Sequence, residues 1–124
     1  MKNIPDAKQA EEFDRYIQHW QQVLSLKSWR IERVKKPASN AMASVSCDLE
    51  AKLATYRLGD FAGTEINPES LSKTALHEIL HVFLHDLITG ARDSRTSDEQ
   101  LSALEHGVIN VLEKVLYDES NSQR

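Results

Sequence analysis

Two histidines and a glutamate that could form a catalytic metal site lie in one stretch of the sequence, Thr74-Ala75-Leu76-His77-Glu78-Ile79-Leu80-His81-Val82-Phe83. His77 and His81 are four residues apart, so on a helix their imidazoles lie on one face, close enough to share a metal ion. Zinc binds neutral imidazole nitrogens at about 2.0–2.1 Å, and a catalytic zinc typically has three protein ligands and a water. Glu78 is placed to take a proton from that water. The stretch therefore predicts a hydrolytic zinc site.

The residues around these polar groups are those of a buried helix. Ala75, Ile79, Leu80, Val82 and Phe83 are uncharged, and neither proline nor glycine interrupts the run. Such neighbours can pack while the ligands are held rigidly. The alternative is an amphipathic helix that carries two histidines and a glutamate without a metal. We disfavour it, because three polar groups on one stripe of an apolar helix are costly without a partner.

Composition places the chain among ordinary single-domain globular proteins. It has 124 residues, 40% hydrophobic and 27% charged, and a net charge of −4, which counts against a nucleic-acid or anionic-membrane partner. Cys47 is the single cysteine, so no internal disulfide is possible, and we expect it to be a small packed residue. No signal-like or membrane-spanning apolar run occurs, so we expect a cytoplasmic protein without membrane association.

The pattern along the chain predicts an α+β domain over residues 1–124. Asp6 caps a first helix with apolar residues at helical spacing, and alternating patterns over 28–35, 43–48 and 52–58 predict three strands. Because the connections are short, we expect a mainly antiparallel meander. The inward-facing residues expected for the first helix are Ala10, Phe13, Ile17, Trp20 and Leu24, with His19 on the surface.

Two further helices follow the strands. Asn67 caps the helix that carries the histidines, Pro68 occupies its first turn, and Gly90 is a suitable stop. The run Ser97-Asp98-Glu99-Gln100 reads as a capping box that opens a last helix through about Tyr117, followed by a frayed tail over 118–124.

A third zinc ligand must come from outside the motif, and the candidates are His85, Glu99, Glu105 and His106. His85 lies on the same helix face, but about 12 Å from His77, too far to share one ion; it could instead line the cleft. On the last helix Glu105 falls within roughly 60° of the centre of the apolar stripe, whereas Glu99 and His106 point away. A carboxylate that faces a core needs a partner, so we expect Glu105 to be the third ligand. Pairing of Glu105 with Arg92, Arg95 or Lys114, and His106 as the ligand, stay open.

The ten-residue stretch resembles the extended signature of the zincin metallopeptidases. His77, His81 and Glu105 together resemble the ligand set of the gluzincins, and Glu105-His106 before an apolar helix is similar to the ending of small phage- and prophage-type zincins. The resemblance implies a small zincin-like domain with zinc as cofactor and Glu78 as general base. It also implies a sheet edge that pairs with an extended substrate, by analogy the segment Ala51 to Leu58.

The function predicted from the sequence is that of a zinc-dependent endopeptidase acting on protein or peptide substrates. A metal-activated water attacks the peptide carbonyl, and Glu78 carries its proton to the leaving amine; His85 or an arginine of 92–95 could assist the oxyanion. The rival is a non-catalytic zincin-like metal-binding domain that regulates or binds another protein. A third possibility, action on protein bound to nucleic acid, is weakened by the acidic net charge.

Overall fold

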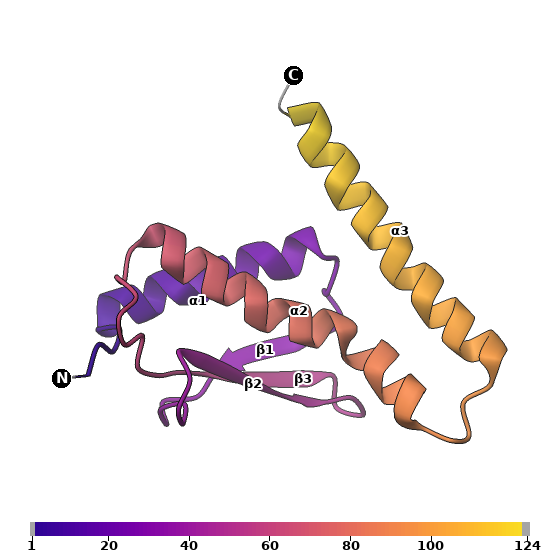
Figure 1. The fold of residues 1–124 in the computed structure, drawn as a ribbon, viewed down its shortest axis with the longest axis horizontal. Coiled ribbons are helices and arrows are strands. Elements are labelled where there is room, and N and C mark those ends of the chain that lie inside the picture. Colours follow the sequence, from indigo (N-terminus) through magenta and orange to yellow (C-terminus); the bar gives the residue numbers. More distant parts are fainter. Residues whose placement is uncertain (1, 123–124) are drawn as a thin grey trace.

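The computed structural model describes residues 2–122, with side chains described through Leu116. Its elements in order are α1 (Ala7–Val23), β1 (Arg30–Arg33), β2 (Ala43–Asp48), β3 (Leu53–Leu58), α2 (Pro68–Arg92) and α3 (Asp98–Ser122). Helices α1 and α2 lie together on one face of the sheet, and α3 turns back beyond the end of α2 (Figure 1). The predicted α+β class is therefore confirmed.

Helix α1 begins where the sequence predicted. The Asp6 side chain accepts a hydrogen bond from the Gln9 N–H, and the Gln9 side chain accepts one from the Asp6 N–H, which completes a capping box. Ala10, Phe13 and Ile17 are buried and His19 is exposed, as expected. This face fixes α1 against α2 and the sheet.

The predicted meander is wrong. The sheet is mixed, with strand order β1-β3-β2: β3 pairs antiparallel with β2 and parallel with β1. The connection over 34–42 is long enough to carry the chain past the position of β3, which the 49–52 turn then places between the two earlier strands. The central strand carries the buried Ala54 and Tyr56, whereas the outer strands carry charged or hydroxyl side chains that water can reach.

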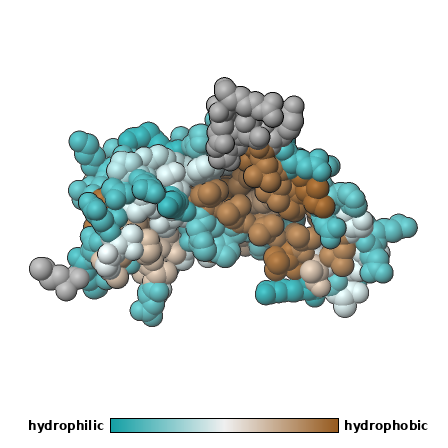
Figure 2. Space-filling model, turned by 45° about the horizontal axis from the view of Figure 1, so that its top comes forward, coloured by the Kyte–Doolittle hydropathy of each residue, from teal (hydrophilic) through white to brown (hydrophobic). Residues whose placement is uncertain are grey.

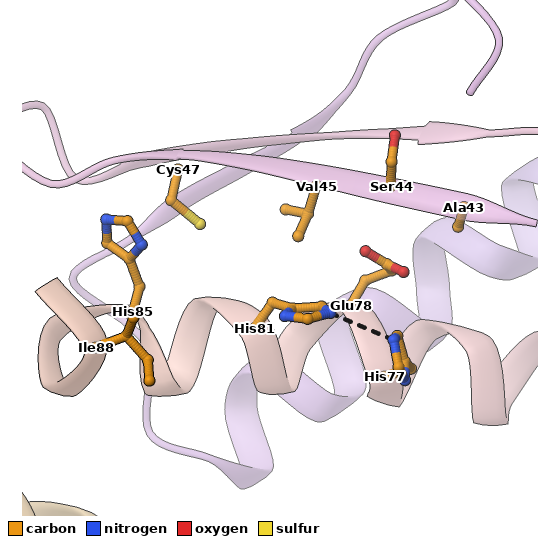
Figure 3. Close-up of a pocket in the computed structure, with 9 residues that line it drawn as sticks. All are labelled: Ala43, Ser44, Val45, Cys47, His77, Glu78, His81, His85 and Ile88. Carbon is orange, nitrogen blue, oxygen red and sulfur yellow. Dashed lines mark hydrogen bonds between the residues drawn. The ribbon is translucent and has the colours of Figure 1, made fainter. Parts of the chain in front are cut away.

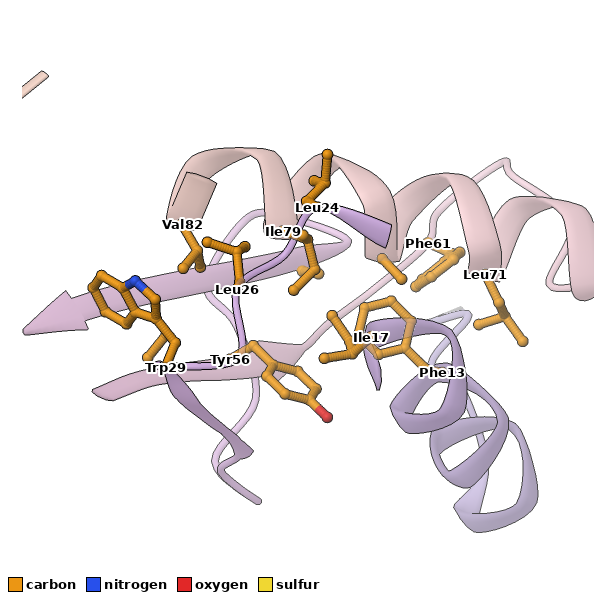
Figure 4. Packing of buried hydrophobic residues seen from close by; sticks show 13 residues of the cluster. Phe13, Ile17, Leu24, Leu26, Trp29, Tyr56, Phe61, Leu71, Ile79 and Val82 are labelled. Atoms are coloured by element: carbon orange, nitrogen blue, oxygen red, sulfur yellow. The ribbon is translucent and has the colours of Figure 1, made fainter. Parts of the chain in front are cut away.

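The core lies between the sheet and the two helices that cover it (Figure 4). Its largest fully buried side chains are Phe13, Ile17, Phe61, Leu71, Ile79 and Val82. Burying each such side chain contributes about 1.5–3 kcal/mol. Because α2 contributes three of these residues, its rotation about its own axis is fixed, and so is the face that it presents to β2.

Helix α2 is capped as predicted and runs slightly further. The Asn67 side chain accepts a hydrogen bond from the Ser70 N–H, and Pro68 occupies the first turn. Gly90 does not stop the helix, which ends at Arg92. No glycine described has a positive φ, so Gly90 is helical here. Leu104 and Leu101 of α3 pack beside it, and the absent side chain makes room for them.

Helix α3 opens with the predicted capping box, in which Ser97 and Gln100 exchange side-chain and main-chain hydrogen bonds. It continues to Ser122. The frayed tail expected over 118–124 stays a prediction, and residues 123 and 124 lie outside the described part. Residues 101, 104, 108, 111 and 115 are half-buried, and its other side chains described are exposed. No helix in residues 2–122 is long and apolar enough to span a membrane.

Candidate metal centre

The two motif histidines lie side by side on the outer face of α2. Their Nε2 atoms are 3.3 Å apart, and the ring planes meet at 80° with centroids 4.9 Å apart. Both side chains are exposed, because the opposite face of α2, with Ala75, Ile79 and Val82, is buried in the core. The four-residue spacing alone brings the rings together, as predicted.

This pair fits a tetrahedral ion. Two nitrogens bound to zinc at about 2.0–2.1 Å and a tetrahedral angle lie about 3.3–3.4 Å from each other. The observed separation between the Nε2 atoms, 3.3 Å, agrees with that value. Without a metal, the same contact is a hydrogen bond in which the Nε2–H of one ring donates to the Nε2 of the other. The donor type and spacing therefore suit a shared metal ion.

Glu78 is the one charged side chain in the described core, with 5% of its surface exposed. Burial raises the pKa of its carboxyl group, while nearby His77 and His81 act in the opposite direction. Its carboxylate points towards β2, beside Val45 and Ala43 (Figure 3). The carboxylate thus lies in the groove next to the histidine pair, partly shielded from water.

The groove runs between α2 and the edge strand β2. One chamber, of about 510 Å³, is lined by Ala43, Ser44, Val45, Cys47, His77, Glu78, His81, His85 and Ile88. A second, of about 400 Å³, shares Ala43, His77 and Glu78 with the first and continues past Met42, Lys73 and Thr74. Open space therefore extends to both sides of Glu78.

The strand beside this groove is not the predicted one. Ala51 to Leu58 contains the central strand β3, whose two sides are already paired, and β2 is the edge strand that lines the groove. The prediction failed because it assumed a meander, in which the last strand is an edge. The correct edge is Ala43–Asp48.

The free main-chain groups of β2 follow from its pairing with β3. The Gly59 N–H donates to the Met42 carbonyl at 2.8 Å, one residue beyond the Ala43–Leu58 pair. Hydrogen-bonded pairs alternate along an antiparallel ladder. Ser44, Ser46 and Asp48 therefore bond to β3, and Ala43, Val45 and Cys47 direct their main-chain groups towards the open edge. The side chains of these last three line the groove.

His85 and Cys47 lie at one end of the groove. Of the two, only His85 was named from the sequence as a residue that could line the cleft. The His85 ring meets Trp29 edge to face, with centroids 6.1 Å apart, and Lys52 Nζ lies 5.2 Å from the centroid of the same indole. Burial, and secondarily Asp86, raise the pKa of the Cys47 thiol. Cys47 was expected to be a small packed residue, but it lines the groove. The alternation of β2, with Ala43, Val45 and Cys47 on one face, was the signal that could have placed it there.

Glu105 is exposed on α3, so the expectation that it faces a core is wrong. The half-buried stripe of α3 is narrow and turned towards α2, and Glu105 lies just outside it. Glu99 and His106 are also exposed, and the His106 ring bonds to the Ser102 carbonyl of its own helix at 2.7 Å. Among the side chains that the structure describes, no three His, Cys, Asp or Glu residues form a metal-holding group. Glu105 as a third ligand stays a prediction.

Comparison with known proteins adds no name to this site. No protein-family model, no curated protein and no solved structure matches the chain. The groove and the residues that line it are therefore the basis for proposing a function.

Proposed function

We propose that the protein is a zinc-dependent peptidase whose reaction centre is formed by His77, Glu78 and His81. The observation that carries this proposal is the pairing of two imidazoles, with Nε2 atoms 3.3 Å apart, beside a nearly buried carboxylate in one groove. A metal-holding function alone has no use for Glu78, whose burial is unfavourable for its charged form. A hydrolytic function gives that carboxylate a purpose.

Each side chain has a distinct task. His77 and His81 would hold the ion. Zinc, when bound, supplies a Lewis acid that polarises a carbonyl and lowers the pKa of water towards about 7. Glu78 accepts the proton of the attacking water on a carboxylate oxygen and delivers it to the leaving amine. The nearly buried position of Glu78 favours the first step, because a raised carboxyl pKa makes the group a better proton acceptor.

An extended peptide is the substrate that this groove suits. The outward main-chain groups of Ala43, Val45 and Cys47 can pair with a peptide added antiparallel or parallel to β2. A chain held at that edge runs past Glu78, because the groove continues to both sides of it. The proposed substrates are therefore unfolded or loop segments of proteins.

Glu105 is the third protein ligand in this proposal. Glu105 would complete a His₂Glu set only with α3 nearer to the histidines than it is here. Zinc content separates the possibilities: we expect Glu105→Gln to weaken zinc binding if Glu105 is a ligand, whereas Glu99→Gln, on the same exposed helix, should leave it unchanged.

The second candidate function is a metal-binding domain that recognises another protein without cleaving it. The lack of a three-ligand group in the described residues favours it. The test is to load the protein with one equivalent of zinc and incubate it with a panel of denatured proteins. Cleavage that a chelator removes and zinc restores supports the peptidase. Stoichiometric zinc without any cleavage favours the binding domain.

A further inference from the structure

Large apolar side chains are exposed together on α2 and α3. They are Leu84 (36%), Ile88 (47%), Ile109 (39%), Leu112 (37%) and Leu116 (63%), and we call them the α2–α3 apolar surface. Figure 2 shows a broad hydrophobic area on one side of the molecule, in contrast to the hydrophilic remainder of that face. Scattered apolar residues are normal on a surface, but a contiguous set marks an interaction site.

The α2 part of this surface continues the stripe of the histidine pair. His77, His81, Leu84 and Ile88 are spaced by four, three and four residues, so they share one face of the helix. Ile88 also lines the groove together with both histidines. The α2 part of the apolar surface is therefore continuous with the candidate reaction centre.

The α3 part has an acidic border. Asp98 and Glu105 precede Ile109, Leu112 and Leu116 on the same helix stripe, at spacings of seven, four, three and four residues. Both carboxylates are exposed, as is Glu113 next to Leu112. Lys114 lies on another face of the helix, two residues from Leu112. The apolar stripe thus has negative charge at one end and one flank.

We propose that this surface binds a part of the substrate that is not cleaved: an extended segment with large apolar side chains next to lysine or arginine. The inference rests on the proposed function, because it assigns the groove and the surface to one polypeptide. Two observations select this occupant. Ile88 joins the surface to the groove, and the acidic border complements basic residues; binding of a second copy is distinguished by the test below.

The test compares two labelled peptides on the metal-free protein, so that binding is measured without turnover. Both have the same length and the same apolar core of leucine and phenylalanine; one carries lysines beside that core and the other glutamates. Fluorescence anisotropy should give a dissociation constant several-fold lower for the lysine peptide, and added salt should shrink that difference.

Variants locate the contact. Leu112→Ser and, on the other helix, Leu84→Ser should each weaken binding of the lysine peptide by about five- to tenfold, the effect of removing one apolar contact. Ile4→Ser is the control, because Ile4 is also a large exposed apolar residue (45%) but lies before α1, and it should have no effect. All three side chains are exposed, so circular dichroism should show unchanged folding.

Three results would overturn the inference: equal affinity for the two peptides, equal affinity of the variants and the control, or a dimer that Leu112→Ser converts to monomer. The last would make this surface an interface between copies. None of these depends on catalysis. Failure of zinc-loaded protein to cleave, with selective binding of the lysine peptide retained, would instead contradict the proposed function and leave the surface in place.

Discussion

Zinc should raise the thermal stability of this protein, and replacing one motif histidine should remove most of that gain. The Nε2 atoms of His77 and His81 are already separated by the distance that a tetrahedral ion needs, so neither side chain has to be reorganised on binding. A ligand that binds the folded state alone, at a free concentration 100 times its dissociation constant, adds about 2.7 kcal/mol to the free energy of unfolding. For a domain of this size that corresponds to an increase in Tm of about 10 °C.

The variant His81→Gln leaves a single imidazole at the site. If its affinity for zinc falls about 100-fold, the same zinc concentration adds only about 0.4 kcal/mol, and Tm rises by about 2 °C. The assay is a thermal melt monitored by circular dichroism. Protein prepared without metal is melted once as it is and once after zinc is added. His19→Gln, an exposed histidine on α1, is the control and should keep the whole increase. A full increase in His81→Gln, or none in the unaltered protein, would refute the assignment of this pair as metal ligands.

Two further predictions concern the scaffold. Gly59→Ala should lower the free energy of unfolding by about 1–3 kcal/mol in a denaturant titration, because the added Cβ overlaps the main-chain oxygen of Ala41. Gly63→Ala is the control and should be nearly neutral, because the space around Gly63 is open. Equal effects of the two substitutions would contradict the packing described. Burial and the hydrogen bond to Asp14 raise the pKa of Tyr56 above its ordinary value of about 10, so its contribution to stability is complete below pH 10 and is lost as pH rises beyond it. Between pH 10 and pH 11 the Tyr56→Phe variant should therefore lose less stability than the unaltered protein, as measured by thermal melts of both proteins at each pH. Equal losses in the two proteins would show that Tyr56 is not responsible.

Local signals in the sequence were sufficient for the elements of this fold. Asp6, Asn67 and Ser97 each open a helix through side-chain hydrogen bonds to main-chain groups within the same few residues, so their effect does not depend on tertiary structure. The helical spacing of His77 and His81 likewise fixes their separation before any packing. These features could be read from the sequence because their causes are local.

The sheet order could not be read in the same way. Whether β3 lies outside β2 or between β1 and β2 depends on how the 34–42 connection crosses the sheet, and no residue in that connection encodes the choice. The misplacement of the substrate edge followed from this one error. Cys47 was separated from the histidines in sequence, and only the position of β2 as the edge brings it into the groove.

Glu105 shows that the spacing of apolar residues along a helix does not always predict which side chains face the core. Its angle placed it near the apolar stripe, but α3 has two apolar stripes: one contacts α2, and the other, with Ile109, Leu112 and Leu116, is exposed. Glu105 lies on the second, exposed stripe, four residues before Ile109. The distribution of apolar residues around a helix gives the direction of a core only when there is one core to face.

The substitution Glu78→Gln tests the central claim most directly. It keeps the size of the side chain and both histidines but removes the proton acceptor from the groove. If Glu78 is the proton acceptor, the variant binds as much zinc per chain as the unaltered protein and no longer cleaves denatured protein. Undiminished cleavage by a zinc-loaded Glu78→Gln variant would contradict this role of Glu78.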